Sequence, residues 1–192
     1  MLATRNAHKL RELDGLLGAE ALRPLPPDVV LPPETGETFE ANALLKARAA
    51  ASALRTTVLA DDSGIEAAAL GGAPGVRSAR FAGQDASDKE NLEKLLREVP
   101  IGGNRRVAYV CVLALVAPDG GERVFEGRCE GVLAEAPRGF GGFGYDPAFV
   151  PVEADDGRTM AELAVREKDA ISHRGHAARA LRAWLEAGDL RS

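Results

Sequence analysis

Cysteine is scarce in this 192-residue chain, which has only two, at positions 111 and 129. The two cysteines form neither a CxxC pair nor a zinc-binding spacing, and both lie in segments with a strand-like pattern. We therefore expect Cys111 and Cys129 to be two small buried side chains, not metal ligands.

Long apolar runs are missing as well. The longest, residues 107–117, has 11 residues and is too short to span a bilayer as a helix. No apolar segment of signal-peptide length follows Met1. We expect a cytoplasmic protein with no membrane partner.

Basic charge is not in excess either. The chain has 24 Lys and Arg residues against 29 Asp and Glu residues, which gives a net charge of -5. A net-acidic protein has no general affinity for nucleic acid, so we expect no nucleic-acid partner. An anionic substrate would have to be met by a local cluster of basic groups. Only five of the basic residues are lysines, so each lysine is a candidate for such a cluster.

Helical and strand patterns alternate along the chain. Leucines at positions 10, 13, 16 and 17 recur on one helix face after Asn6, a residue suited to cap that helix. Capping boxes are expected at Ser87 with Glu90 and at Thr159 with Glu162. We expect further helices over residues 39–54, where Thr38 is suited to be the cap, after Ser87, after Thr159 and from near Ser172. Strands are expected over residues 56–60, 107–117, 123–133 and 148–152.

The strands over residues 107–117 and 123–133 are separated by a short Asp-Gly-Gly turn, which is typical of an antiparallel hairpin. Helices and strands that alternate around such a hairpin indicate an α/β fold built on a mixed sheet. No linker or repeat divides the chain, so we expect a single domain over residues 1–192.

The first candidate for chemistry is a polar turn between a short strand and a helix N-terminus. Free N–H groups and the positive end of the helix dipole favour a phosphate there, and Lys9 adds a charge. The commoner alternative is an Asn cap followed by a solvated lysine. The turn lacks the spacing of an ordinary P-loop. It comprises Thr4, Arg5, Asn6, Ala7, His8 and Lys9.

Two adjacent aspartates, Asp61 and Asp62, follow the strand expected over residues 56–60. Neighbouring side chains of an extended segment point to opposite faces, so one carboxylate could face a ligand while the other braces the loop. A carboxylate at this edge can hold Mg²⁺ or take a proton from a water molecule. The alternative is a turn that hydrogen-bonds its own backbone.

The helix expected over residues 39–54 has Asn42 and Lys46 four positions apart, and therefore on one face. Glu34 and Glu37 precede this helix and could supply a second carboxylate to a magnesium site. The alternative is an ordinary solvated helix face with surface acids.

Near the C-terminal end, aromatic residues alternate with glycines in residues 141–147, which suits stacking against a flat heterocycle. A hydrophobic plug over the core is an equally good interpretation. His173 and His176 have the spacing of metal ligands, but no third zinc ligand is evident in the sequence. Hydrogen bonds from His173 and Arg174 to a base or phosphate are a better interpretation of this segment.

In this order the motifs closely resemble those of the Ham1/RdgB-type inosine triphosphate pyrophosphatases, which hydrolyse non-standard purine nucleoside triphosphates to monophosphate and pyrophosphate. The matching stretches are residues 3–9, 38–43, 60–64, 71–75, 142–147 and 172–175.

The resemblance implies a long mixed β-sheet flanked by helices, with two lobes and a central cleft, assembled as a homodimer. It implies that residues 4–9 hold the triphosphate of ITP, dITP or XTP and that Asp62 is the catalytic carboxylate, working with Mg²⁺. Glu34 is the expected second metal ligand, and Lys46 is expected to stabilise charge on the leaving group. The nucleotide site is expected to include Ser63, Phe143, Gly144, Tyr145, Asp146, Lys168, His173 and Arg174.

Two other functions remain open at this point. One is a pyrophosphatase for other bases, such as modified pyrimidines. The other is a nucleotide-binding module without catalysis, in which the acidic segment at Asp62 would be structural. Arg5 also stands where the family often has glycine, which leaves the backbone geometry of the phosphate turn open.

Overall fold

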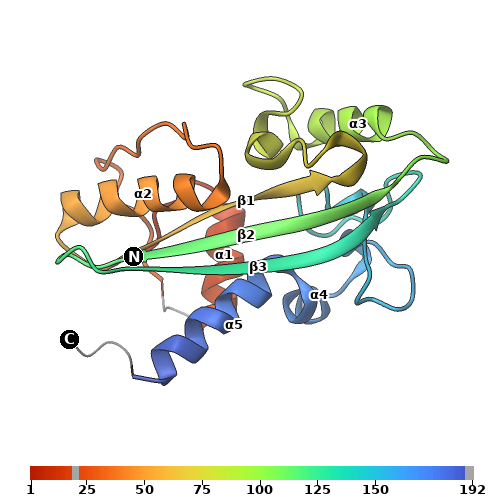
Figure 1. Cartoon of the computed structure of the whole chain (residues 1–192). Coiled ribbons are helices and arrows are strands. Elements are labelled where there is room, and N and C mark those ends of the chain that lie inside the picture. The colour runs from red at the N-terminus through yellow and green to blue at the C-terminus, as the bar shows by residue number, and fades with distance from the viewer. Residues whose placement is uncertain (19–21, 189–192) are drawn as a thin grey trace. The chain divides into compact units, whose positions relative to one another are not determined.

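The computed structural model describes residues 1–18 and 22–188, which form five α-helices and four strands (Figure 1). The strands pair in the order β1-β2-β3-β4. The helices are α1 (Ala7–Leu17), α2 (Phe39–Leu54), α3 (Asp88–Glu98), α4 (Val165–Ile171) and α5 (His173–Glu186), and the strands are β1 (Val58–Ala67), β2 (Arg106–Val116), β3 (Glu122–Leu133) and β4 (Phe149–Pro151).

Three helices begin at the side-chain caps that the sequence predicts. The Asn6 side chain accepts hydrogen bonds from the backbone N–H groups of His8 and Lys9, at 2.9 and 3.2 Å. Thr38 caps α2 in the same way, and Ser87 with Glu90 forms a capping box at α3. Each cap satisfies N–H groups that the first helical turn leaves without a backbone acceptor. The predicted starts of these helices are therefore confirmed.

The sheet is mixed, as predicted. The turn after β2 is closed by the Ala117 N–H, which donates to the Gly121 carbonyl at 2.8 Å. β3 and β4 pair antiparallel, with Val132 opposite Val150. Leu2 forms isolated parallel bridges to Pro24 and Leu59. The α/β fold class with a mixed sheet flanked by helices is confirmed.

The prediction of a strand that ends at residue 60 is wrong. β1 continues to Ala67, so Asp61 and Asp62 lie within the strand and not in a turn after it. An Asp-Asp-Ser-Gly sequence is typical of turns because the side chains can bond their own backbone. Here both carboxylates are buried and bind side chains from other elements, which removes that competition.

The last part of the chain also differs from prediction. The capping box of Thr159 and Glu162 is present, but it caps only a short 3₁₀ turn, Met160–Glu162. The following α-helix, α4, begins at Val165, and α5 begins at His173, near the predicted position. The last strand is limited to Phe149–Pro151 because residues 146–148 form another 3₁₀ turn.

The chain divides into two compact units that alternate along the sequence. The first unit comprises Met1–Asp62, Cys111–Gly127 and Arg174–Ser192, and the second comprises Ser63–Val110 and Arg128–His173.

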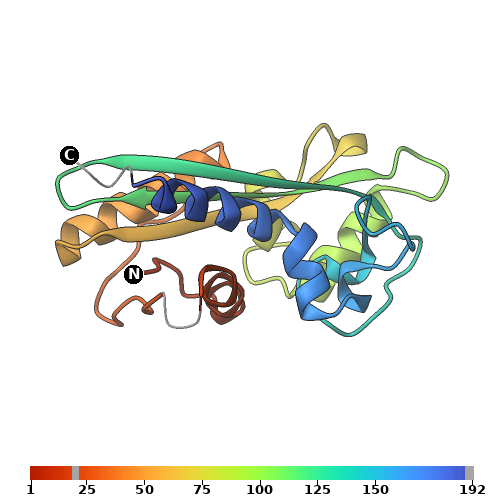
Figure 2. The same ribbon diagram turned by 90° about the horizontal axis from the view of Figure 1, so that it is seen from below.

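In the first unit, α2 lies on one side of the strands, and α1 and α5 lie on the other (Figure 1). Figure 2 shows α5 running along the strands on its side. The core between the strands, α1 and α5 is aliphatic and includes a buried cysteine. It is formed by Leu2, Leu13, Leu59, Cys111, Leu113, Ala177 and Leu181.

The second unit has its own core, in which α3 packs against strand residues and the glycine-rich loop. Its largest fully buried side chains include Phe149, Ile65 and Leu95. Cys129 is buried in this core, so the prediction that both cysteines are buried is confirmed. Among residues 1–18 and 22–188, no helix is long and apolar enough to cross a membrane.

Candidate active site

The two adjacent aspartates of β1 bind different lysines. The Asp61 carboxylate lies 2.8 Å from the Lys9 ammonium of α1. The Asp62 carboxylate lies 3.4 Å from the Lys46 ammonium of α2. Successive side chains of a strand point to opposite faces, and α1 and α2 lie on opposite sides of the strands (Figure 1). One strand therefore presents a separate ion pair on each face.

On the α2 side, a small polar cluster surrounds Asp62. Asn42, which is fully buried, donates from its amide nitrogen to Asp62 at 3.2 Å. Its amide oxygen accepts from the Gly36 N–H at 2.8 Å, which fixes the orientation of the amide. Lys46 also contacts Glu34, at 2.6 Å. The i, i+4 spacing of Asn42 and Lys46 places both on one helix face, as predicted, and that face is buried.

The two carboxyl groups are shifted in opposite directions. Burial raises the pKa of Asp62 above its ordinary value and Glu34 adds to this, although Lys46 opposes the shift. Burial also acts to raise the pKa of Asp61, but Lys9 and the other nearby cations outweigh it, so that pKa is lowered. Pairs of carboxyls whose pKa values are pushed apart are typical of sites that divide structural and proton-transfer roles.

Lys46 stays charged in this cluster. Burial acts to lower its pKa, but the carboxylates of Asp62, Asp61 and Glu34 outweigh that effect and raise the pKa. A buried ammonium held by carboxylates is a fixed positive charge, which can stabilise negative charge that develops on a phosphate.

The phosphate turn, residues 4–9, has its polar groups partly engaged within the protein. The Arg5 guanidinium donates to four carbonyls of the proline-rich loop, those of Leu25, Pro26, Pro27 and Val29, at 2.6 to 3.3 Å. Asn6 caps α1, as the structural alternative predicts. A ligand in this turn would therefore meet backbone N–H groups, including that of Ala7, and the Lys9 ammonium. Arg5 would help by holding the loop.

Three further predicted residues, Thr4, His8 and Arg174, belong to the first unit. Thr4 accepts the Asn6 N–H on its hydroxyl at 3.2 Å, which tightens the turn. His8 lies 3.0 Å from the Arg11 guanidinium on the exposed side of α1. Arg174, near the start of α5, is buried and lies 2.9 Å from the Glu12 carboxylate.

In the second unit, the predicted residues gather around the buried Asp146. This carboxylate accepts from the Lys168 ammonium at 2.8 Å, the Phe143 N–H at 3.0 Å and the Tyr109 hydroxyl at 3.0 Å. Gly142 has a positive φ of 70°, and a Cβ there would collide with the Asp146 carboxylate. Only glycine lets the loop close around Asp146 in this way.

The other predicted residues of the second unit are Phe143, Gly144, Tyr145, His173 and Ser63. The Phe143 ring lies 5.4 Å from the Lys168 ammonium, within cation–π range. The Gly144 N–H donates to Asp88 at 2.8 Å, and the Tyr145 hydroxyl donates to the Ser78 carbonyl at 2.7 Å. His173 is buried. Ser63 is half-buried and follows Asp62 in β1.

The residues expected to hold a metal, Asp62 and Glu34, both contact Lys46. Within the part of the chain that the structure describes, no group of three or more His, Cys, Asp or Glu residues could hold a metal ion. Mg²⁺ is commonly bound by one or two carboxylates together with substrate phosphates and water. A pair of carboxylates therefore fits a magnesium ion that arrives with a polyphosphate, and does not fit a metal held by the protein alone.

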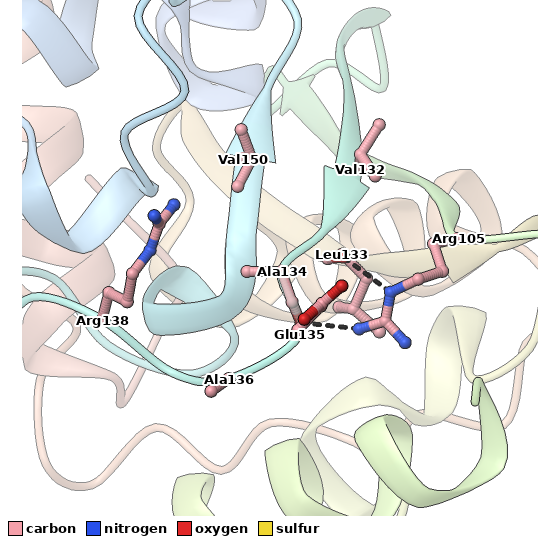
Figure 3. A pocket seen from close by; sticks show the side chains of 8 residues that line it. All are labelled: Arg105, Val132, Leu133, Ala134, Glu135, Ala136, Arg138 and Val150. Carbon is pink, nitrogen blue, oxygen red and sulfur yellow. Dashed lines mark hydrogen bonds between the residues drawn. The ribbon is translucent and has the colours of Figure 1, made fainter. Parts of the chain in front are cut away.

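A cavity of about 510 Å³ in the second unit lies elsewhere (Figure 3). Arg105, Arg138, Val132 and Val150 are among its lining residues, and none of the predicted site residues lines it. The Arg105 guanidinium donates to the Leu133 carbonyl and to two others, at 2.6 to 2.8 Å, so its charge is used to hold the backbone. This cavity does not supply the chemistry of the candidate site.

Three residues that contact the predicted ones were not predicted as site residues. Asp61 was expected only as a brace, Glu12 had no distinguishing pattern, and Tyr109 lies in a strand that reads as apolar. The only sequence signal for Tyr109 is a hydroxyl within the otherwise apolar run 107–117. The hydroxyl of a buried tyrosine needs a partner.

Comparisons with known proteins agree with these motifs. A model of the Ham1 family matches residues 1–184. The dITP/XTP pyrophosphatase of Geobacillus kaustophilus is 49% identical over 187 residues, with 92% of this chain and 89% of that protein covered. The dITP/XTP pyrophosphatase of Symbiobacterium thermophilum is 51% identical over 181 residues, with the same coverage of 92% and 89%.

Solved structures are similar over nearly the whole chain. The Staphylococcus aureus Ham1 protein superposes with a TM-score of 0.84 at 42% identity, and 97% of each chain is covered. A HAM1 protein from Coxiella burnetii gives a TM-score of 0.86 at 42% identity, also with 97% of each chain covered.

The buried pair of Asp61 and Lys9 predicts a pH-dependent contribution to stability. Asp61→Asn should lower the unfolding free energy by about 3 kcal/mol at pH 7, because the lysine loses its buried partner. The Asp61 pKa is lowered by folding, so this contribution is complete above the ordinary carboxyl pKa of about 4 and is lost as the pH falls further.

Urea denaturation of both proteins from pH 7 down to about pH 2.5 measures this difference, which should shrink at the acidic end. Asp28→Asn, at an exposed aspartate of the same unit, is the control and should change stability little. Equal stability of wild type and Asp61→Asn at pH 7 would contradict the assignment.

Proposed function

Because this chain belongs to the Ham1 family, we propose that it hydrolyses non-canonical purine nucleoside triphosphates, namely ITP, dITP and XTP, to the monophosphate and pyrophosphate. Removal of deaminated purines from the nucleotide pool would be its role. The observation that carries the proposal is the buried cluster of Asp62, Lys46 and Asn42, with the half-buried Glu34 beside it, in which a carboxyl with a raised pKa adjoins a fixed ammonium.

Asp62 would orient or deprotonate the water that attacks the α-phosphorus. The best general base has a pKa near the working pH, and burial moves the pKa of Asp62 in that direction. Asn42 holds one carboxylate oxygen at 3.2 Å, which keeps the group oriented. In phosphoryl transfer the protein contributes mainly positioning and charge stabilisation. A preorganised carboxylate contributes to positioning.

Charge stabilisation would come from two lysines. Lys46 is buried and charged, so it could offset the charge that develops on the departing pyrophosphate. Lys9 pairs with Asp61 on the opposite face of β1 from Asp62, so it would reach the triphosphate from the end of α1, where the helix N–H groups favour an anion.

Mg²⁺ would be held by Asp62 and Glu34 together with phosphate oxygens. When bound, the ion would supply neutralisation of the phosphate charge and polarisation of a nearby water. Glu34 stands at the end of the proline-rich loop, and its contact with Lys46 at 2.6 Å keeps its carboxylate beside Asp62.

Residues of the second unit would recognise the base. Inosine and xanthosine carry an oxygen at purine position 6, where adenosine carries an amino group. Donors such as Lys168, His173 and the N–H groups near Phe143 would bind the 6-oxygen of inosine or xanthosine. The 6-amino group of adenosine offers these donors no acceptor. Such a mismatch can separate two substrates by roughly 10⁴.

The homodimer, the cytoplasmic location and the single domain over residues 1–192 stay predictions. The single domain is supported by the order of the units in the sequence, since the segments of the first unit enclose those of the second and neither unit is one continuous stretch.

Pyrophosphate release from a panel of nucleotides tests the proposed function. With Mg²⁺ present, we expect kcat/KM for ITP, dITP and XTP to exceed that for ATP by roughly 10⁴. Chelation of the metal should abolish turnover. Preference for dUTP or another pyrimidine would favour the alternative pyrophosphatase, and ITP binding without any pyrophosphate would favour a binding module. Either result would overturn the proposal.

Asp62→Asn tests the general base. The change keeps the size of the side chain and removes its basicity, so kcat should fall by a factor on the order of 100 or more, with ITP affinity largely retained. Asp28→Asn, at an exposed carboxylate of the same unit, should keep the wild-type kcat. Unchanged turnover in Asp62→Asn would remove this residue from the proposed role.

Two neighbouring glutamates provide a matched test of the metal site. Glu34→Gln should raise the Mg²⁺ concentration needed for half-maximal activity by roughly tenfold or more, because one carboxylate of the pair is lost. Glu37→Gln changes an exposed glutamate three positions later and should leave the Mg²⁺ titration unchanged. The opposite pattern would assign the metal to Glu37.

A further inference from the structure

Tyr109 lies on β2 in the second unit and is nearly fully buried, with 6% of its surface exposed. Its hydroxyl donates to Asp146 Oδ1 at 3.0 Å. Its ring stacks on His173, with the centroids 4.6 Å apart and the planes 16° apart. It also stacks on Phe149, at 4.3 Å and 22°. One side chain thus contacts two residues that we assign to base recognition.

The carboxylate of Asp146 depends on this hydroxyl for one of its two oxygens. Oδ2 accepts from the Phe143 N–H and the Lys168 ammonium. Within residues 1–18 and 22–188, Oδ1 accepts from Tyr109 alone. A carboxylate held at both oxygens cannot rotate about its Cβ–Cγ bond without breaking a hydrogen bond. The position of the Lys168 ammonium is fixed by the same group.

The other buried tyrosine of this core shows what a purely structural hydroxyl does. Tyr145 donates to the Ser78 backbone carbonyl at 2.7 Å and so holds two loops together. The Tyr109 hydroxyl instead donates to a buried carboxylate of the candidate site. Phenylalanine would fill the same space without the cost of burying a hydroxyl. The hydroxyl is therefore useful chiefly through Asp146.

We propose that Tyr109 is a positioning residue for base recognition, which holds Asp146 through its hydroxyl and the His173 imidazole through its ring. The inference rests on the proposed function, because it needs Lys168, His173 and the Phe143 loop to contact the base. Tyr109 itself does not touch the substrate. Loss of the Tyr109 hydroxyl should make the donors to the purine 6-oxygen less well fixed in position. The cluster around Asp62, which would activate the water, should stay intact.

Tyr109→Phe is the direct test, because it removes the hydroxyl and keeps the stacked ring. We expect KM for ITP to rise roughly three- to tenfold, as for the loss of one hydrogen bond to a charged group, with kcat within about twofold of wild type. The ratio of kcat/KM for ITP to that for ATP should fall by a similar factor. An unchanged KM and ratio, or a loss confined to kcat, would overturn the inference.

Val107→Ala is the matched control for a loss of stability alone. Val107 lies two residues earlier on β2, in the same buried core, and makes no polar contact with the site. It should lower the unfolding free energy and leave KM for ITP and the ITP/ATP ratio unchanged. If Val107→Ala shifts KM for ITP and the ITP/ATP ratio as much as Tyr109→Phe does, the effect of Tyr109→Phe is general destabilisation and the inference fails.

A double-mutant cycle with Asp146→Asn tests whether Tyr109 acts through that carboxylate. In the Asp146→Asn background, Tyr109→Phe should change ITP affinity by less than about twofold, because the interaction is already lost. Fully additive effects would show that the tyrosine acts by another route and would overturn the inference.

Measurement of ITP affinity by calorimetry distinguishes failure of this inference from failure of the proposed function. If the wild type binds ITP but releases no pyrophosphate, the proposed activity fails, and the affinities of Tyr109→Phe and the double mutant still decide the role of Tyr109. Suppose instead that the wild type releases pyrophosphate and that the ITP affinity of Tyr109→Phe equals that of the wild type. In that case only the positioning role fails. A wild type that does not bind ITP would overturn both.

Discussion

The burial of two adjacent carboxylates in β1 is the constraint on which the candidate site depends. A strand that places Asp61 and Asp62 on opposite faces needs a cation on each side, because an unpaired buried charge is very costly. Lys9 and Lys46 meet that need from α1 and α2, at 2.8 and 3.4 Å. Helices α1 and α2 are thereby tied to the strand. Lys9 and other nearby cations outweigh burial and lower the Asp61 pKa, whereas burial outweighs Lys46 and raises the Asp62 pKa.

Local signals made much of the fold predictable. Asn6, Thr38 and Ser87 cap their helices through hydrogen bonds that involve only nearby residues, so sequence alone locates them. β1 was not predictable at its full length, because the segment after residue 60 has the composition of a turn. What makes it a strand is its partners, which come from elsewhere in the chain. In the second unit, residue types alone indicated stacking by the loop at residues 141–147 and hydrogen bonding by His173, whereas family resemblance indicated the assignments of Asp146 and Lys168.

The residues that prediction missed share one property: each acts on another side chain and not through a motif of its own. Tyr109 sits in an apolar run whose pattern indicates a buried strand, and that prediction is confirmed. The pattern gives no information on which buried group the hydroxyl meets. Arg5 is a similar case, since its four carbonyl acceptors lie some 20 residues away, in a loop without regular structure. Long-range hydrogen bonds of this kind leave no periodic signal.

Two of the four borders between the units fall between Asp62 and Ser63 and between His173 and Arg174. Residues that are neighbours in sequence, and that we assign to one reaction, thus belong to different units. Neither unit is encoded by a continuous stretch of gene, so recombination at a single crossover cannot exchange one of them as a whole.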